Sequence, residues 1–181
     1  MYMITWQLQL ALFSTGLSAA SLLYLAFKLH DKNHPRTLSE IAITSLKSLW
    51  YFRIVLWVSG LLFASSIYTT IPRFEYAFYV FTAANIAIFG TLMLAVFPSR
   101  EGWNLAIHNA TAHVMALGMA MLVLLFAIGG TGVYAYLEYV FFGLLLFCTC
   151  MAVSYRSYFI HFEMLFVLIA HVSIVTALYF V

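Results

Sequence analysis

Long runs of apolar residues, separated by short polar connections, make up most of the chain. A helix needs about 20 apolar residues to cross roughly 30 Å of hydrocarbon, and six stretches reach that length. Lipid offers no partners to backbone N–H and C=O groups, so each span must be helical. The pattern predicts an all-α polytopic membrane protein, in which residues 1–181 form one domain, a bundle of six transmembrane helices. The predicted spans are Trp6–Leu29, Leu49–Ile71, Ala77–Phe97, Asn104–Ile128, Tyr134–Tyr155 and Ser157–Val181.

The composition excludes an ordinary soluble domain. Apolar residues make up 65% of the 181 residues and charged residues only 8%, whereas charged residues supply about 25% of a typical soluble domain. The formal net charge is only +2, which gives no reason to expect a nucleic acid as partner. The composition therefore favours a membrane lipid as the natural partner.

Charged residues are distributed unevenly between the two ends of the predicted bundle. Eleven of fourteen lie in or beside the connections that follow the first, third and fifth spans. These connections hold seven of the eight Lys and Arg residues, and basic residues in short loops mark the cytoplasmic side. We therefore expect these connections in the cytoplasm and both termini outside. The eleven are Lys28, Asp31, Lys32, Arg36, Glu40, Lys47, Arg53, Arg100, Glu101, Arg156 and Glu163, and the other three are Arg73, Glu75 and Glu138.

Small residues are concentrated in the first and fourth spans. Because helix backbones approach closely in lipid where side chains are small, we expect these two spans in the bundle interior. The aromatic-rich second, fifth and sixth spans are expected to face lipid in part. The small residues are Ser14, Gly16, Ser18, Ala20 and Ser21 in the first span, and Ala106, Ala110, Ala112, Ala116, Gly118 and Ala120 in the fourth.

The long connection His30–Ser48 contains the first polar group of interest. Thr37 and Glu40 have the spacing of a capping box, in which each side chain bonds the backbone N–H of the other residue. That structural role and a functional one both remain open. In the functional interpretation, the Ser39 hydroxyl and the Glu40 carboxylate face the lipid headgroups.

A second polar group surrounds the start of the fourth span. Asn104 and His108 are one helical turn apart, and so are Asn109 and His113. His113 lies about 14 Å into the span at 1.5 Å per residue. Polar groups at that depth are costly and usually face the bundle interior, so we expect the same here.

These groups predict a lipid-binding or lipid-sensing site formed by the alternate connections. Ser39, Glu40, Arg100, Glu101, Asn104 and His108 would converge there, with Asn109 and His113 as further ligand-binding residues. Arg53 and Arg100 would hold a phosphate. If the site also remodels lipid, His108 would be the general base and Ser39 the nucleophile, although the chain lacks a Gly-x-Ser-x-Gly elbow.

The order of these motifs resembles the Frag/DRAM/Sfk superfamily of six-span membrane proteins, most closely its prokaryotic DUF998-like branch. The resemblance rests on Ser39-Glu40 before the second span, Phe97-Pro98 at the end of the third, and His108 entering the fourth. It implies a prokaryotic inner membrane and a shared role for Ser39, Glu40, Pro98 and His108. Eukaryotic relatives imply lipid remodelling and an external or lumenal site. This chain differs from the family in having Ser99-Arg100-Glu101 after the Phe-Pro pair.

Two other functions fit the same sequence. In the first, the chain is a non-catalytic subunit or scaffold, and its buried polar groups fix its packing against partner membrane subunits or a second copy. In the second, His113 and His171 ligate a haem, since neutral imidazole is a common metal ligand. Apart from that haem alternative, the sequence predicts no cofactor and no metal.

Overall fold

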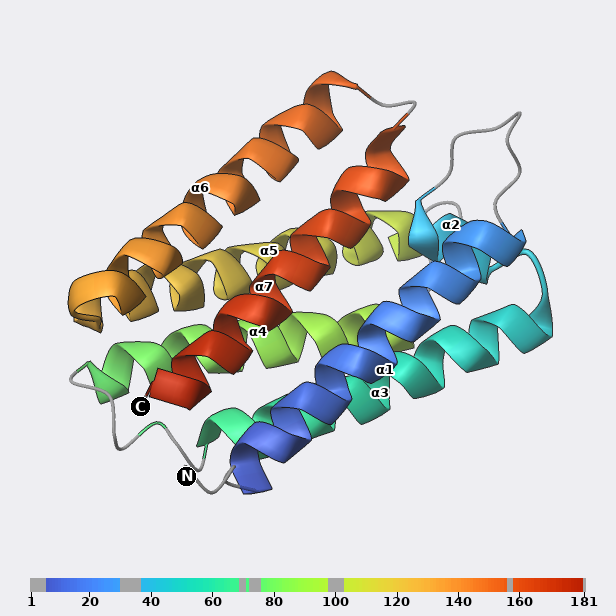
Figure 1. Cartoon of the computed structure of the whole chain (residues 1–181). Coiled ribbons are helices and arrows are strands. Elements are labelled where there is room, and N and C mark those ends of the chain that lie inside the picture. The colour runs from blue at the N-terminus through green and yellow to red at the C-terminus, as the bar shows by residue number, and fades with distance from the viewer. Residues whose placement is uncertain are drawn as a thin grey trace.

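The computed structural model describes residues 6–29, 37–68, 71, 76–97, 103–155 and 158–180. The described chain is all-α, as predicted (Figure 1). Five residues in the long connection form the short helix α2 (Leu38–Ala42). The long helices are α1 (Trp6–Leu29), α3 (Leu46–Tyr68), α4 (Ala77–Val96), α5 (Trp103–Gly129), α6 (Gly132–Ser154) and α7 (Phe159–Phe180).

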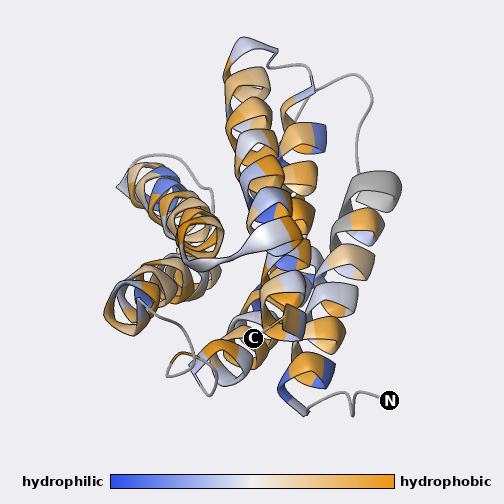
Figure 2. Cartoon of the chain, turned by 60° about the vertical axis from the view of Figure 1, so that its left-hand side comes forward, coloured by the Kyte–Doolittle hydropathy of each residue, from blue (hydrophilic) through white to orange (hydrophobic). Residues whose placement is uncertain are grey.

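Five of the helices, α3 to α7, are long and apolar enough to cross a membrane. Figure 2 shows that hydrophobic residues run along the outward as well as the inward sides of the long helices. A helix that is apolar all round belongs in a protein core or in lipid. Since exposed faces carry Phe, Trp, Leu and Val side chains, the chain is an integral membrane protein.

The helices run alternately up and down through the bundle. α1 packs on α3 and α7, α4 packs between α3 and α5, and α6 packs on α5 and α7. Figure 1 shows both marked termini at one end of the bundle and α2 at the other. The α2 end, which we call the polar end, also receives the last turns of α4 and α6 and the first turns of α5 and α7.

The closest helix contact is between α4 and α5. A Cβ added to Gly118 would lie 2.4 Å from the backbone nitrogen of Ala87, and one added to Gly90 would lie 2.5 Å from that of Met115. Small residues in both helices therefore bring the backbones together, as lipid-embedded helices require.

The expectation that the first and fourth spans form the interior is not met in full. Half of the spanning window is buried in α4 (50%) and in α7 (50%), compared with 33% in α5 and 17% in α6. Among α3 to α7, α4 and α7 are therefore the most enclosed. Each long helix has at least two neighbours in the bundle, so small-residue content alone does not decide which helices are the most buried.

The second span begins at Leu46 rather than at Leu49 as expected. Ser45 precedes the helix, and its hydroxyl accepts a hydrogen bond from the backbone N–H of Ser48 at 3.0 Å. A serine at this position satisfies one of the amide groups that a helix leaves unpaired at its start. The polar residues before the apolar run thus belong to the helix.

Candidate functional site

Glu40 takes part in the predicted capping box. Its carboxylate accepts a hydrogen bond from the Thr37 backbone N–H at 3.0 Å, and its own N–H donates to the Thr37 hydroxyl at 3.1 Å. This reciprocal pair closes the first turn of α2. The carboxylate therefore has a structural task, whatever else it contacts.

The helix α2 is held against the polar end by apolar packing. Ile41 and Ala42 are fully buried in a small cluster with Phe52 of α3 and Ile160 of α7. The side chain of Ser39 lies outside the described part of the chain, and so do Arg100 and Glu101. The convergence of these three residues with His108 stays a prediction.

His108 ties the beginning of α5 to the end of α4. Its side chain is only 4% exposed, and its Nδ1 lies 2.8 Å from the carbonyl oxygen of Phe97. With Nδ1 donating to that carbonyl, Nε2 is left as an acceptor. His108 thus closes the junction between two spans, and its Nε2 is the atom through which the predicted general-base role would operate.

The other predicted polar residues of α5 face outward, against our expectation. Asn104, Asn109 and His113 are all exposed. His108 and His113 are five residues apart, which at about 100° per residue turns their side chains about 140° away from each other. Gly118 fixes the face of α5 that packs on α4, so the exposed His113 lies on a different side of the helix, where it borders a cavity with residues of α6 and α7.

Arg53 lies in a groove on the outer surface between α3 and α4. The groove encloses about 470 Å³ and is otherwise apolar, with Arg53 as its one charged lining residue among those described. The Arg53 guanidinium stands 5.4 Å from the ring centre of Trp50, a cation–π distance. The lining residues are Trp50, Arg53, Ile54, Trp57, Val58, Ala95 and Val96.

The hydrogen bonds of Arg53 are incomplete. The Nη2 group donates a hydrogen bond to the Val96 carbonyl oxygen at 3.3 Å. This carbonyl is one of those that a helix leaves unpaired at its end. The Nε is buried and has no hydrogen-bond partner within the described chain. A guanidinium carries five N–H groups, so Arg53 retains donors for an anionic ligand. It lies seven residues after the first residue of α3, about 10 Å into the helix.

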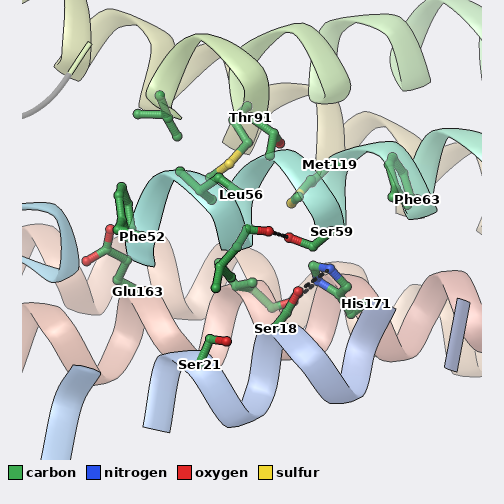
Figure 3. A pocket seen from close by; sticks show the side chains of 15 residues that line it. Ser18, Ser21, Phe52, Leu56, Ser59, Phe63, Thr91, Met119, Glu163 and His171 are labelled. Atoms are coloured by element: carbon green, nitrogen blue, oxygen red, sulfur yellow. Dashed lines mark hydrogen bonds between the residues drawn. The ribbon is translucent and has the colours of Figure 1, made fainter. Parts of the chain in front are cut away.

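A second cavity lies inside the bundle and extends from the polar half to the middle of the helices (Figure 3). It encloses about 80 Å³, enough for several water molecules, since one needs about 10–15 Å³ by the same measure. His171 bonds the Val167 carbonyl through Nδ1 at 2.8 Å, and its Nε2 lies 3.4 Å from the Ser18 hydroxyl. The polar lining comes from four helices and consists of Ser18, Ser21, Ser59, Thr91, Glu163 and His171.

A third cavity, of about 180 Å³, adjoins this one on the side of α5 and α6. Both cavities share Met115, Glu163 and Val167 as a wall. The outer cavity contains His113 and Thr149, and Phe159, Phe162 and Phe166 make its walls apolar. Glu163 is therefore the polar group between a hydroxyl-lined interior space and an aromatic outer one.

The structure does not bring His113 and His171 together. His113 lines the outer cavity and His171 the inner one. The Nε2 of His171, the atom that would ligate a haem iron, faces Ser18 of α1. Among the described residues no cluster of three or more His, Cys, Asp or Glu side chains could hold a metal ion.

A buried carboxyl group near the end with the termini was not expected from the sequence. Glu138 was counted among the three charged residues at that end, but its side chain is 0% exposed. Its Oε2 accepts a hydrogen bond from the Ser173 hydroxyl of α7. The available signal was its place inside the predicted span Tyr134–Tyr155, one turn after Tyr134 and in line with buried Leu145 and Ala152 at seven-residue intervals.

No family model, curated protein or solved structure matches this chain. The resemblance to the Frag/DRAM/Sfk superfamily therefore stays a prediction.

Proposed function

We propose that this protein is a six-span membrane protein that binds an anionic phospholipid, with the lipid phosphate held by Arg53. The observation that carries the proposal is the unsatisfied guanidinium of Arg53 in an otherwise apolar groove. A planar guanidinium pairs with a phosphate through two parallel hydrogen bonds. Such a ligand would accept hydrogen bonds from the Arg53 N–H groups that are not bonded to the Val96 carbonyl oxygen.

The surroundings of Arg53 favour a lipid over a soluble phosphate compound. Trp50 and Trp57 are exposed on the outer face, and Trp residues gather at the level of lipid headgroups. The apolar side chains of Ile54 and Val58 continue the groove along α3, where an acyl chain would lie. The groove has no acidic lining residue among those described, so a headgroup with net negative charge suits it better than a zwitterionic one.

The sixth span of the proposal is α1. It has 24 residues and is about 36 Å long at 1.5 Å per residue, more than the roughly 30 Å of hydrocarbon. Six spans place both termini on one side. The excess of Lys and Arg at the polar end favours a position of that end, with Arg53, in the cytoplasm of a prokaryotic cell, where anionic lipid headgroups attract basic groups.

The test is a mass-spectrometric inventory of lipids that remain bound to the purified protein in mild detergent. We expect the wild-type protein to retain an anionic phospholipid and the Arg53→Ala variant to retain at least about tenfold less of it. The reason is that hydrogen bonds to charged groups contribute about 1.5–3 kcal/mol, and about 1.4 kcal/mol corresponds to a tenfold change in affinity. Arg53→Lys should retain part of the binding, since it keeps the charge without the planar fork.

The matched control is Lys47→Ala. Lys47 is an exposed cation on the same helix and six residues, nearly two turns, closer to its start, so the change removes the same charge from the same end. Lipid retention should stay at the wild-type level. An equal loss of retained lipid in both variants would show that only general electrostatic attraction is at work, and would contradict a specific site at Arg53.

A second candidate function, a subunit of a membrane complex, is favoured by the outward-facing Asn109 and His113. Polar groups deep in a span usually face protein or a water-filled cavity, and these two are exposed on the single chain. A second copy or partner subunit on this face of α5 would cover them. If so, His113→Leu should change the oligomeric state measured in detergent, whereas an unchanged state would leave the outer cavity open to lipid.

A further inference from the structure

Glu138 is buried in the part of α6 that packs on two neighbouring helices. These are α5 and α7, and buried apolar residues of both, such as Phe126 of α5 and Ile174 of α7, belong to the main core. The carboxyl group is fully enclosed and lies six residues after the start of α6, about 9 Å along that helix. Water does not reach it.

Hydrogen bonds satisfy only half of this carboxyl group. The Ser173 hydroxyl donates to Oε2, while Oε1 is buried without a hydrogen-bond partner in the described structure. Tyr134 precedes Glu138 by one helical turn, and its hydroxyl is also buried and unpartnered. Two orphaned polar atoms thus occur on the same side of α6.

No described cation is available to neutralise a carboxylate at this place. The described titratable groups of α5 and α7 are His108, His113, His161, Glu163, His171 and Tyr179. The first four lie in the halves of these helices toward the polar end. Tyr179 is exposed, and His171 is bonded to Ser18 and Val167. Arg73 and Glu75, in the connection at this end, lie outside the described residues. An ionised group without a partner is very costly in such surroundings, and it takes up a proton instead.

We propose that Glu138 is a proton-binding site of the membrane domain, where the resting protein holds a neutral carboxylic acid with its proton on Oε1. Oε2 is engaged by Ser173, so Oε1 is the oxygen free to carry the proton. The Tyr134 hydroxyl, which also has no hydrogen-bond partner in the described structure, lies one helical turn before Glu138. A small cation such as Na⁺ fits the site less well, because it needs several oxygen ligands and the backbone carbonyls of helices are already bonded.

The test uses infrared spectroscopy of the full-length protein in lipid at neutral pH. A protonated carboxyl group has a C=O stretching band well separated from the bands of carboxylates, and Glu138→Gln should abolish one such band. Glu163→Gln is the matched control, with the same substitution in a different spanning helix, and should leave that band in place.

A second variant keeps the proposal testable if Glu138→Gln does not fold. Ser173→Ala removes the hydrogen bond to Oε2, so the band should shift to higher frequency without disappearing. The absence of a Glu138-dependent band in folded protein would overturn the proposal. So would a band that appears only after sodium is removed, because Na⁺ would then be the natural occupant.

Discussion

At the scale of single residues, the structure assigns roles that depend on what each side chain faces. Glu40 bonds its own helix start, His108 bonds the end of the preceding span, and Arg53 keeps unpaired donors in an outer groove. A polar residue that is already satisfied stabilises the fold, whereas one that lacks a partner has capacity for a ligand. This distinction is why Arg53 rather than His108 carries the proposed function.

The role of Glu40 can be tested by comparing two substitutions. A capping box accepts Gln as well as Glu, so Glu40→Gln should keep the wild-type melting temperature in detergent. Glu40→Ala removes the bond to the Thr37 N–H and should cost about 1 kcal/mol, the usual cost of a lost cap. A Glu40→Gln variant that keeps its stability but loses lipid retention would show that the carboxylate charge serves the site as well.

Local spacing predicted some of these residues and not others. The capping box was readable because both partners lie within one turn of sequence. The outward direction of His113 was not readable, because it depends on the rotation of α5, which Gly118 sets by packing on Ala87 of another helix. The partner of Glu138 is Ser173, 35 residues away, and such long-range pairs have no local signal.

At the scale of helices, the contact between α4 and α5 determines which side chains face the interior. The backbone approach at Gly118 and Gly90 leaves no room for a Cβ. Apolar runs and small residues were sufficient to predict helices and a close contact involving the fourth span. They did not identify α4 as its partner or predict that half of the α7 window is buried, since both follow from how the helices pack in space.

Two glycine substitutions test this contact. Gly118→Ala would place a Cβ 2.4 Å from the Ala87 backbone nitrogen, so the helices must separate, and the expected loss of stability is about 1–3 kcal/mol. Gly143→Ala is the matched control in the interior of α6, where a Cβ meets nothing within 4 Å. It should be neutral or stabilise by about 0.5–1 kcal/mol through helix propensity. Thermal unfolding in one detergent measures both, and similar effects from the two would contradict the close contact.

At the scale of the whole molecule, the polar end and the opposite end have different chemistry. The polar end has Arg53, the two cavities that share Glu163, and α2 with its capping box. The opposite end has both termini (Figure 1) and the buried pair of Glu138 and Ser173. The charge bias predicted different chemistry at the two ends, but it gave no sign that Glu138, one of the three charged residues counted at the end with the termini, is buried.

The number of spans can be tested through the two termini. If α1 crosses the membrane, the termini lie on the same side, and reporter fusions at each terminus should give the same external signal. With five spans they would lie on opposite sides and the two reporters would differ. The same signals from inside the cell would keep six spans but reverse the orientation that the basic residues indicate.

The most direct test of lipid binding at Arg53 is quenching of tryptophan fluorescence by brominated lipids. The chain has four tryptophans, and replacing Trp6 and Trp103 by Phe leaves Trp50 and Trp57, which both line the groove. We predict that brominated phosphatidylglycerol quenches them at a lower mole fraction than brominated phosphatidylcholine. The difference should vanish in Arg53→Ala and persist in Lys47→Ala. Equal quenching by the two lipids in the protein with Arg53 intact would contradict an anionic-lipid site in this groove.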